Sequence, residues 1–225
     1  MTADGLSIVL SATPAAGDQF SALNNGNVIL SPQEFESNEV GFKWNINPRL
    51  LYTAAAYDLD RKNVPLPDPS HPGFFILSGR NEIRGFESSL VGYVTDAWQS
   101  TLGYAYTDAR VTGATSPTIV VGNRIQLVPF NQFSYWNKYQ INPYWGAALG
   151  VIYFSNSFAS SDDSVKLPGF WRFDAGLFLT IIETWRAQFN VENLFDRGYW
   201  ASADGNNNIS PGAGRTFRVS ATAKF

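Results

Sequence analysis

The chain contains no cysteine, and only 16% of its 225 residues are charged. The absence of cysteine excludes disulfides and thiolate metal sites, so redox chemistry does not reveal the compartment. Lysine and arginine number 16 against 19 aspartates and glutamates, which excludes the basic surface that is typical of nucleic-acid-binding proteins. We therefore expect no nucleic acid among the partners.

Long apolar runs are also missing. The longest, 147–154, is too short for a membrane-spanning helix, which needs about 20 residues, whereas a tilted β-strand crosses a membrane with about 9 to 11. If this chain crosses a membrane, it must use strands. The first six residues have neither the positive charge nor the apolar stretch of a secretory signal, so we expect a fragment of an exported protein.

What the chain does have is aromatic residues, at 15%, and a strict alternation of apolar and polar positions. In the final segment, every second residue is apolar: Phe217, Val219, Ala221, Ala223 and Phe225. Segments 185–192 and 171–181 repeat the pattern, except that Phe178 falls on the polar side. A period of two is that of a β-strand, and segments of about ten such residues separated by turns are typical of membrane barrels.

We predict an all-β fold, a transmembrane antiparallel β-barrel of the outer-membrane type. About ten strands are expected, at roughly 6–13, 35–46, 50–62, 74–94, 98–110, 126–140, 145–156, 167–181, 185–194 and 215–225. Short turns at 47–49, 95–97, 142–143 and 183–184 alternate with long connections at 14–34, 63–73, 111–125, 157–166 and 195–214. This rhythm is typical of short periplasmic turns and long external loops, and it predicts both termini on the periplasmic side.

Tryptophans recur next to the short turns. Four lie there, at Trp44, Trp98, Trp145 and Trp185. Indole rings are favoured at membrane interfaces, so we expect these four to form a periplasmic aromatic girdle. The alternative, aromatics at strand ends inside a soluble sandwich core, is less consistent with four indoles at one end and with the loop rhythm.

Charged residues on the polar sides of the strands are expected to face the lumen. The expected set is Glu39, Lys43, Asp58, Asp60, Glu87, Arg172, Asp174, Arg186, Glu192, Arg218 and Lys224. We interpret most of them as pairing across neighbouring strands rather than as substrate contacts. Arg84 has the parity of apolar Phe86, so either it lies above the bilayer or a bulge intervenes.

Catalytic and metal-binding patterns are weak. The one histidine, His71, lies in a proline-rich loop without the orienting partners that a catalytic base needs. The stretch 204–208 begins like a calcium loop but lacks the glycine and the glutamate of that motif. We expect no enzyme activity, no catalytic residues, no metal site and no cofactor.

Four motifs together resemble the barrel of TonB-dependent receptors. They are the stretch 190–199 (NVENLFDRGY), the stretch 211–215 (PGAGR) with the strand that ends at Phe225, the stretch 39–44 (EVGFKW) after 32–36 (PQEFE), and 84–87 (RGFE). Asn38 stands where the family usually has tyrosine. The stretches 17–20 and 206–214 most resemble receptors for ferric siderophores, including catecholates.

The resemblance implies a barrel of roughly twenty-two strands around an N-terminal plug that the TonB complex moves to admit a ferric siderophore. Residues 1–225 would be a C-terminal barrel segment without signal peptide, TonB box or plug, and incomplete on its own. It would lie in the bacterial outer membrane, in contact with lipid and the barrel assembly machinery, and contact TonB only through the missing part. The alternative is a small barrel closed by strands 6–13 and 215–225, acting as a passive pore or structural protein.

The resemblance also suggests residues for these roles. For an aromatic, anionic iron chelate, the candidate contacts are loop aromatics and cations: Phe158, Tyr199, Trp200, Arg124 and Arg215. The alternative for each is packing that holds the loops together. Phe217 and Phe225 on the terminal strand would form the signal that the assembly machinery reads.

Overall fold

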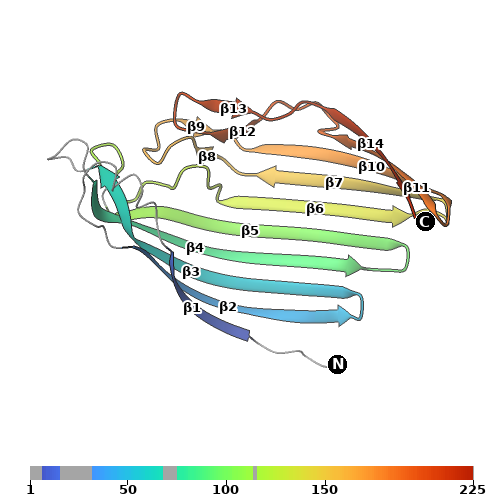
Figure 1. The fold of residues 1–225 in the computed structure, drawn as a ribbon, viewed down its shortest axis with the longest axis horizontal. Helices are drawn as coiled ribbons and strands as arrows, with labels where there is room; N and C mark the ends of the chain where they lie inside the picture. The colour runs from blue at the N-terminus through green and yellow to red at the C-terminus, as the bar shows by residue number, and fades with distance from the viewer. Residues whose placement is uncertain (1–6, 16–31, 68–74, 114–115, 225) are drawn as a thin grey trace.

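The computed structural model describes residues 7–15, 32–67, 75–113 and 116–224, which form only strands and connections (Figure 1). Ten strands form one sheet in chain order: β1 (Ser7–Ala15), β2 (Gln33–Asn47), β3 (Leu50–Pro67), β4 (Phe75–Tyr93), β5 (Trp98–Gly113), β6 (Asn131–Gln140), β7 (Trp145–Phe154), β10 (Phe170–Ile182), β11 (Trp185–Glu192) and β14 (Thr216–Ala223). Every neighbouring pair is antiparallel. None of the described residues forms a helix long and apolar enough to cross a membrane.

The two faces of the sheet differ in polarity because the strand registers align residues of one kind. Leu177 of β10 lies opposite Ala147 of β7 and Phe189 of β11, and Phe189 lies opposite Val219 of β14. On the other face, Thr180 lies opposite Arg186, which lies opposite Thr222. The apolar face is exposed along this wall, with Val219 at 78%, so the protein has an apolar outer surface.

The predicted strands are confirmed in number and order, but several bounds differ. β3 continues past the expected end at residue 62, because a bulge between Arg61 and Val64, with Asn63 at φ 56°, carries the strand to Pro67. β6 begins only at Asn131, because 126–130 pack among the loops described below.

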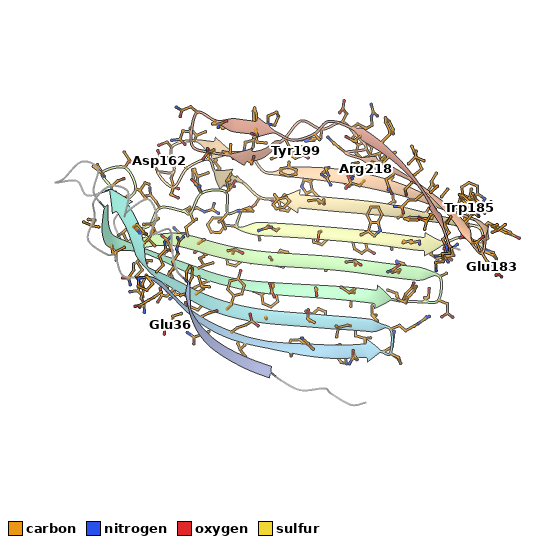
Figure 2. All side chains as sticks on the ribbon, viewed as in Figure 1. Glu36, Asp162, Glu183, Trp185, Tyr199 and Arg218 are labelled. Atoms are coloured by element: carbon orange, nitrogen blue, oxygen red, sulfur yellow. The ribbon has the colours of Figure 1, made fainter. Side chains whose placement is uncertain are left out.

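The four tryptophans lie where the sequence predicts them, at the short-turn ends of their strands and on the apolar face. Trp44, Trp145 and Trp185 are about half exposed. Trp98 is less exposed, and its indole N–H donates to the Asn137 side chain. Figure 2 shows Trp185 beside the Glu183 turn, at the opposite end of the wall from Asp162. Their role at a membrane interface remains a prediction.

Two of the charges expected to face the lumen, Asp58 and Asp60, lie on the other face. The register of β3 and β4 is continuous here, so Asp58 and its partner Arg84 share the face of Ala56 and Phe86. Asp58 accepts a hydrogen bond from Arg84 at 2.9 Å. The prediction of Asp58 and Asp60 as lumen residues was wrong, because the register places both on the outer face. Charged side chains are tolerated there since these two residues lie beyond the apolar band.

The same observation decides the position of Arg84. No bulge interrupts β4 between Asn81 and Tyr93, so Arg84 is an outer-face residue beyond the apolar band. It belongs to a row of exposed ion pairs across β2 to β5: Lys62–Glu36, Arg80–Asp60, Arg84–Asp58, Arg84–Glu82 and Arg110–Asp108. Exposed ion pairs contribute little to the stability of the fold, but they mark the part of the outer surface that contacts water.

The sheet is open. β1 and β14 lie at opposite edges of the strand order, and the described residues contain no pairing between them (Figure 1). Closure of the first strand on the last, as the alternative of a small barrel requires, is not what the structure shows. Each edge therefore presents unpaired backbone groups, which in lipid cost several kcal/mol each unless other strands pair with them.

Gly85 in the 84–87 motif provides a test of wall packing. A Cβ there would lie 2.3 Å from the Tyr57 ring and 2.7 Å from the Tyr106 carbonyl oxygen, because Tyr57 crosses this glycine to hydrogen-bond Thr107 at 3.1 Å. We expect Gly85→Ala to cost about 1 to 3 kcal/mol through overpacking. The measurement is the midpoint of thermal unfolding in detergent.

Gly103→Ala is the matched control, because a Cβ there meets only the flexible Ser134 hydroxyl, at 3.1 Å. The control is expected to lower the midpoint much less than Gly85→Ala. Equal midpoints for the two variants would show that the Tyr57 crossing does not require glycine.

Candidate functional site

The long connections pack together at one end of the wall. They contain two small hairpins, β8 (Ser157–Phe158) with β9 (Lys166–Leu167), and β12 (Trp200–Ala203) with β13 (Ile209–Pro211). Ala159, Leu167 and Ala203 are buried between them. The buried cluster also contacts Leu127, Val165 and Ile209. The loops at this end therefore form a packed layer with its own small core.

Arg124 lies inside this layer rather than on its surface. It is 6% exposed, with its guanidinium 3.6 Å from the centre of the Phe130 ring and 5.8 Å from that of Phe158. Its Nη2 donates to the Val128 carbonyl at 2.6 Å, and its backbone N–H donates to the Asp163 carboxylate. Burial lowers the pKa of Arg124 from its usual range.

Two of the five candidate ligand contacts are therefore engaged in packing. Arg124 and Phe158 hold one long connection against the next, which is the alternative that the sequence left open. Arg215 has a related role: its backbone N–H donates to Asp196 at 2.8 Å and its Nη1 contacts the Leu194 carbonyl at 3.4 Å. It ties the start of β14 to the loop entry.

Asn193 explains the 190–199 motif, and sequence reasoning missed its role. It is 2% exposed and has φ 53°. Its Nδ2 donates to the carbonyls of Arg197 and Ala213, and its Oδ1 accepts from the Arg197 N–H. Asparagine tolerates this left-handed backbone and supplies both donors and an acceptor, so it closes the base of the 193–215 loop.

The remaining two candidates, Tyr199 and Trp200, line a hollow of about 260 Å³ where these loops meet β7 and β10. The phenol ring of Tyr199 stacks on Phe170 at 4.3 Å between centroids, and Phe170 stacks on Phe154 at 5.4 Å. Trp200 is 44% exposed. Figure 2 shows Tyr199 at the loop side of the wall. We call this hollow the loop-end pocket.

Arg172 adds the cation of the loop-end pocket. Its Nη2 donates to Asp174 at 2.9 Å and its Nη1 to the Tyr199 hydroxyl at 3.4 Å. The Nε is buried and has no hydrogen-bond partner among the described residues. Sequence reasoning assigned Arg172 to pairing across the wall, but its carboxylate partner is on its own strand.

The cross-strand ion pair in this part of the wall joins Arg218 to Glu192, at 3.0 Å. The sequence nevertheless contains a signal that Arg172 lies near the loops, because it is the first polar-face cation of β10 after the loop. Its neighbours in the pocket depend on how the loop folds, which the spacing of residues does not give.

The chemistry of the loop-end pocket suits a flat, electron-rich anion. Stacked rings offer offset-stacking surfaces, and a guanidinium offers a charge with donors aimed in one plane. Among the described residues, no group of three or more His, Cys, Asp and Glu side chains is arranged to hold a metal ion.

Comparison with known proteins identifies the fold family. The family profile described as TonB dependent receptor-like, beta-barrel, matches residues 4–194. The chain belongs to this family. It is thus part of the wall of an outer-membrane β-barrel, and its apolar face is the lipid-facing one.

Relatives within the family are receptors. The chain is 28% identical over 232 residues to the catecholate siderophore receptor Fiu of Escherichia coli K12, covering 98% of this chain and 30% of Fiu. It is 31% identical over 201 residues to the metal-pseudopaline receptor CntO of Pseudomonas aeruginosa, covering 86% of this chain and 28% of CntO. The chain thus spans about a third or less of the length of the relatives it matches.

Solved structures of the family have the same wall. The closed form of Fiu superposes with a TM-score of 0.80 over 98% of this chain and 32% of Fiu, at 28% identity. The siderophore receptor PiuA of Acinetobacter baumannii has the same TM-score over 96% of this chain, at 24% identity, which supports the fold. In TonB-dependent receptor barrels, therefore, this open ten-stranded sheet corresponds to one part of a larger wall.

The terminal strand keeps its predicted pattern. Phe217 is 62% exposed on the lipid-facing side of β14, with its ring 6.1 Å from that of Phe189. Phe225 lies outside the described residues, as does His71. The role of Phe217 and Phe225 as an assembly signal stays a prediction.

Replacing Arg124 tests the packed loop layer. Arg124→Met keeps an unbranched apolar stem against Phe130 but leaves the Val128 carbonyl without its donor. Loss of one buried hydrogen bond costs about 1 to 3 kcal/mol, so we expect local opening to rise about fivefold to a hundredfold. The measurement is the rate of limited proteolysis within 116–130.

Lys166→Met is the control, because Lys166 is an exposed loop cation without an ion pair among the described residues. It should leave the proteolysis rate unchanged. Wild-type resistance in Arg124→Met would contradict the assignment of Arg124 to loop packing.

Asp162 gives the loop layer a pH dependence. Its carboxylate accepts hydrogen bonds from the Ser164 N–H at 3.0 Å and from Asn206 Nδ2 at 2.8 Å, which hold its pKa below the usual range. A lowered folded pKa means that this stabilisation is present above the unfolded pKa of about 3.9 and is lost as pH falls through the folded value. We expect the Ser164 amide to lose hydrogen-exchange protection below about pH 4.

Asp162→Asn removes the titrating group. In that variant, protection of Ser164, corrected for the intrinsic exchange rate, should not change between pH 6 and pH 3. The same acid-induced loss in the variant and the wild type would assign the effect to another group.

Proposed function

We propose that this chain forms the ligand-contacting wall of a TonB-dependent receptor that takes up a ferric siderophore of the catecholate class. The observation that carries the proposal is the loop-end pocket, in which Arg172 lies beside the stacked rings of Tyr199 and Phe170. A ferric catecholate is aromatic and anionic, and these groups match both properties. The siderophore is transported cargo, and the proposal includes no catalysis and no cofactor.

The relatives support this proposal, since Fiu is named as a catecholate siderophore receptor and PiuA as a probable siderophore receptor. Uptake by the whole protein requires more than this chain. The strands that pair with the edges at β1 and β14, and the parts that connect to TonB, lie outside it. Outer-membrane lipid and the barrel assembly machinery are further proposed partners.

The pocket separates this function from that of a passive pore. A pore needs a closed wall and no saturable ligand site. The structure has an open sheet and a hollow with a cation and four aromatic side chains, Phe154, Phe170, Tyr199 and Trp200. These two features favour a receptor segment.

The test uses the protein purified from its native outer membrane in detergent. The probe is one hexadentate tris-catecholate chelate of Fe³⁺, which absorbs light and quenches nearby tryptophan. Saturable quenching is expected, and Trp200→Phe should remove much of it because Trp200 lines the pocket. Arg172→Gln should raise Kd about tenfold to a hundredfold, since hydrogen bonds to charged groups contribute about 1.5 to 3 kcal/mol.

Arg172→Lys keeps the charge and should recover part of the affinity. Arg218→Gln is the control, because it removes a polar-face arginine that does not line the pocket. Binding that is indifferent to Arg172→Gln, in protein that unfolds at the wild-type temperature, would reject the loop-end pocket as the site.

A further inference from the structure

Asp174 of β10 contacts both the cation of the loop-end pocket and the base of the 193–215 loop, although it does not line the pocket itself. Its two carboxylate oxygens have separate partners. Oδ2 accepts from Arg172 Nη2 at 2.9 Å, and Oδ1 accepts from the Asn193 backbone N–H at 2.8 Å. The Asp174 side chain is only 13% exposed, and hydrogen bonds are stronger where water is largely excluded. One carboxylate therefore joins the pocket cation to the loop base.

The 193–215 loop supplies Tyr199 to the pocket. Tyr199 is fixed within the loop, because the Gly212 N–H donates to its carbonyl at 2.8 Å and a Cβ at Gly212 would lie 2.1 Å from its ring. The Asn193 side chain bonds to both ends of the same loop. The position of the Tyr199 ring relative to β10 thus depends on how Asn193 is attached to that strand, as well as on the stacking with Phe170.

The contact that needs this alignment is the one between Arg172 and Tyr199. Their Nη1 to hydroxyl distance is 3.4 Å, at the long limit of a hydrogen bond, so a small displacement would break it. Because the hydroxyl accepts from the guanidinium, its own proton is available to a ligand. A guanidinium and a hydroxyl that converge on one anion bind it more tightly when they are already in place before it arrives.

From these contacts we propose that Asp174 is the positioning residue of the loop-end pocket. It holds the Arg172 guanidinium and the loop that carries Tyr199 in the arrangement that binds an anionic ligand. The identity of the ligand rests on the proposed function. Charge and position predict opposite results here: by Coulomb attraction alone, removing a carboxylate beside Arg172 should strengthen the binding of an anion, whereas loss of a positioning residue should weaken it.

The test is Asp174→Asn in the detergent-purified protein, with quenching of Trp200 by the ferric tris-catecholate chelate as the readout. An amide has one acceptor oxygen in place of two, so either Arg172 or the Asn193 N–H loses its acceptor. Kd should rise about fivefold to thirtyfold, although the pocket has gained one positive charge. A Kd equal to or below the wild-type value would overturn the proposal.

Glu192→Gln is the matched control, because it also removes a carboxylate beside an arginine on the polar face. Glu192 accepts from Arg218 Nε at 3.0 Å, and neither residue lines the pocket. The control makes the same change in charge and should not raise Kd. A rise equal to that of Asp174→Asn would assign the effect to the wall in general. Asp174→Glu keeps two carboxylate oxygens and should recover part of the affinity.

Hydrogen exchange at the Asn193 amide is a second readout, and a purely structural role of Asp174 would not make it depend on ligand. A ligand that fixes Arg172 also fixes the carboxylate that Arg172 shares with this amide, so saturating chelate should slow its exchange in the wild type. In Asp174→Asn the chelate should slow it less. An equal exchange rate with and without chelate in the wild type would overturn the proposal, even if the variant does not assemble.

The proposed function would fail in a different way. Absence of saturable quenching in the wild type would reject the loop-end pocket as the chelate site, and the positioning role with it, since there would be no ligand to position. Saturable quenching that weakens in Arg172→Gln but not in Asp174→Asn would keep the proposed function and reject only the role of Asp174.

Discussion

Backbone hydrogen bonding between neighbouring antiparallel strands is the constraint on which the rest of this structure depends. In lipid there is no water to replace a missing partner, so each N–H and C=O must be satisfied by the next strand. The registers from β1 to β14 meet this demand across the interior of the sheet and fix which residues share a face. The lipid-facing apolar surface and the polar lumen wall follow from that alignment.

The loop layer depends on a different principle. It has little apolar surface, with Ala159, Leu167 and Ala203 as its buried apolar centre, so polar groups supply much of its order. Arg124 and Asn193 are each buried, and each donates to backbone carbonyls within its own connection. Buried polar groups need partners, and a change at either residue leaves a carbonyl unsatisfied. The rigidity of the loop-end pocket therefore rests on residues that need not contact the ligand.

The sequence predicted the wall well because alternation and turn length are local signals that membrane barrels impose on every strand. Strand number, order and the tryptophan positions followed from them. The face on which Asp58 and Asp60 lie did not follow from them, since the face of each residue depends on an unbroken register that runs from β2 to β5. The contact of Arg172 with Tyr199 was not predicted, because it joins residues 27 apart through a loop whose path the strand periodicity does not describe.

The row of outer-face ion pairs from Glu36 to Arg110 has a consequence for how the protein sits in its membrane. On the same face, Ala56 lies next to Asp58 on β3 and Phe86 lies next to Arg84 on β4, so the surface changes from apolar to charged between consecutive outer-face residues of these two strands. Moving the wall inward would drag these charges into hydrocarbon, and moving it outward would bring apolar side chains into water. This sharp boundary sets the depth of the wall, and with it the height at which the β3–β4 hairpin and the loop layer stand above the bilayer. The loop-end pocket is therefore held at a constant distance from the lipid surface.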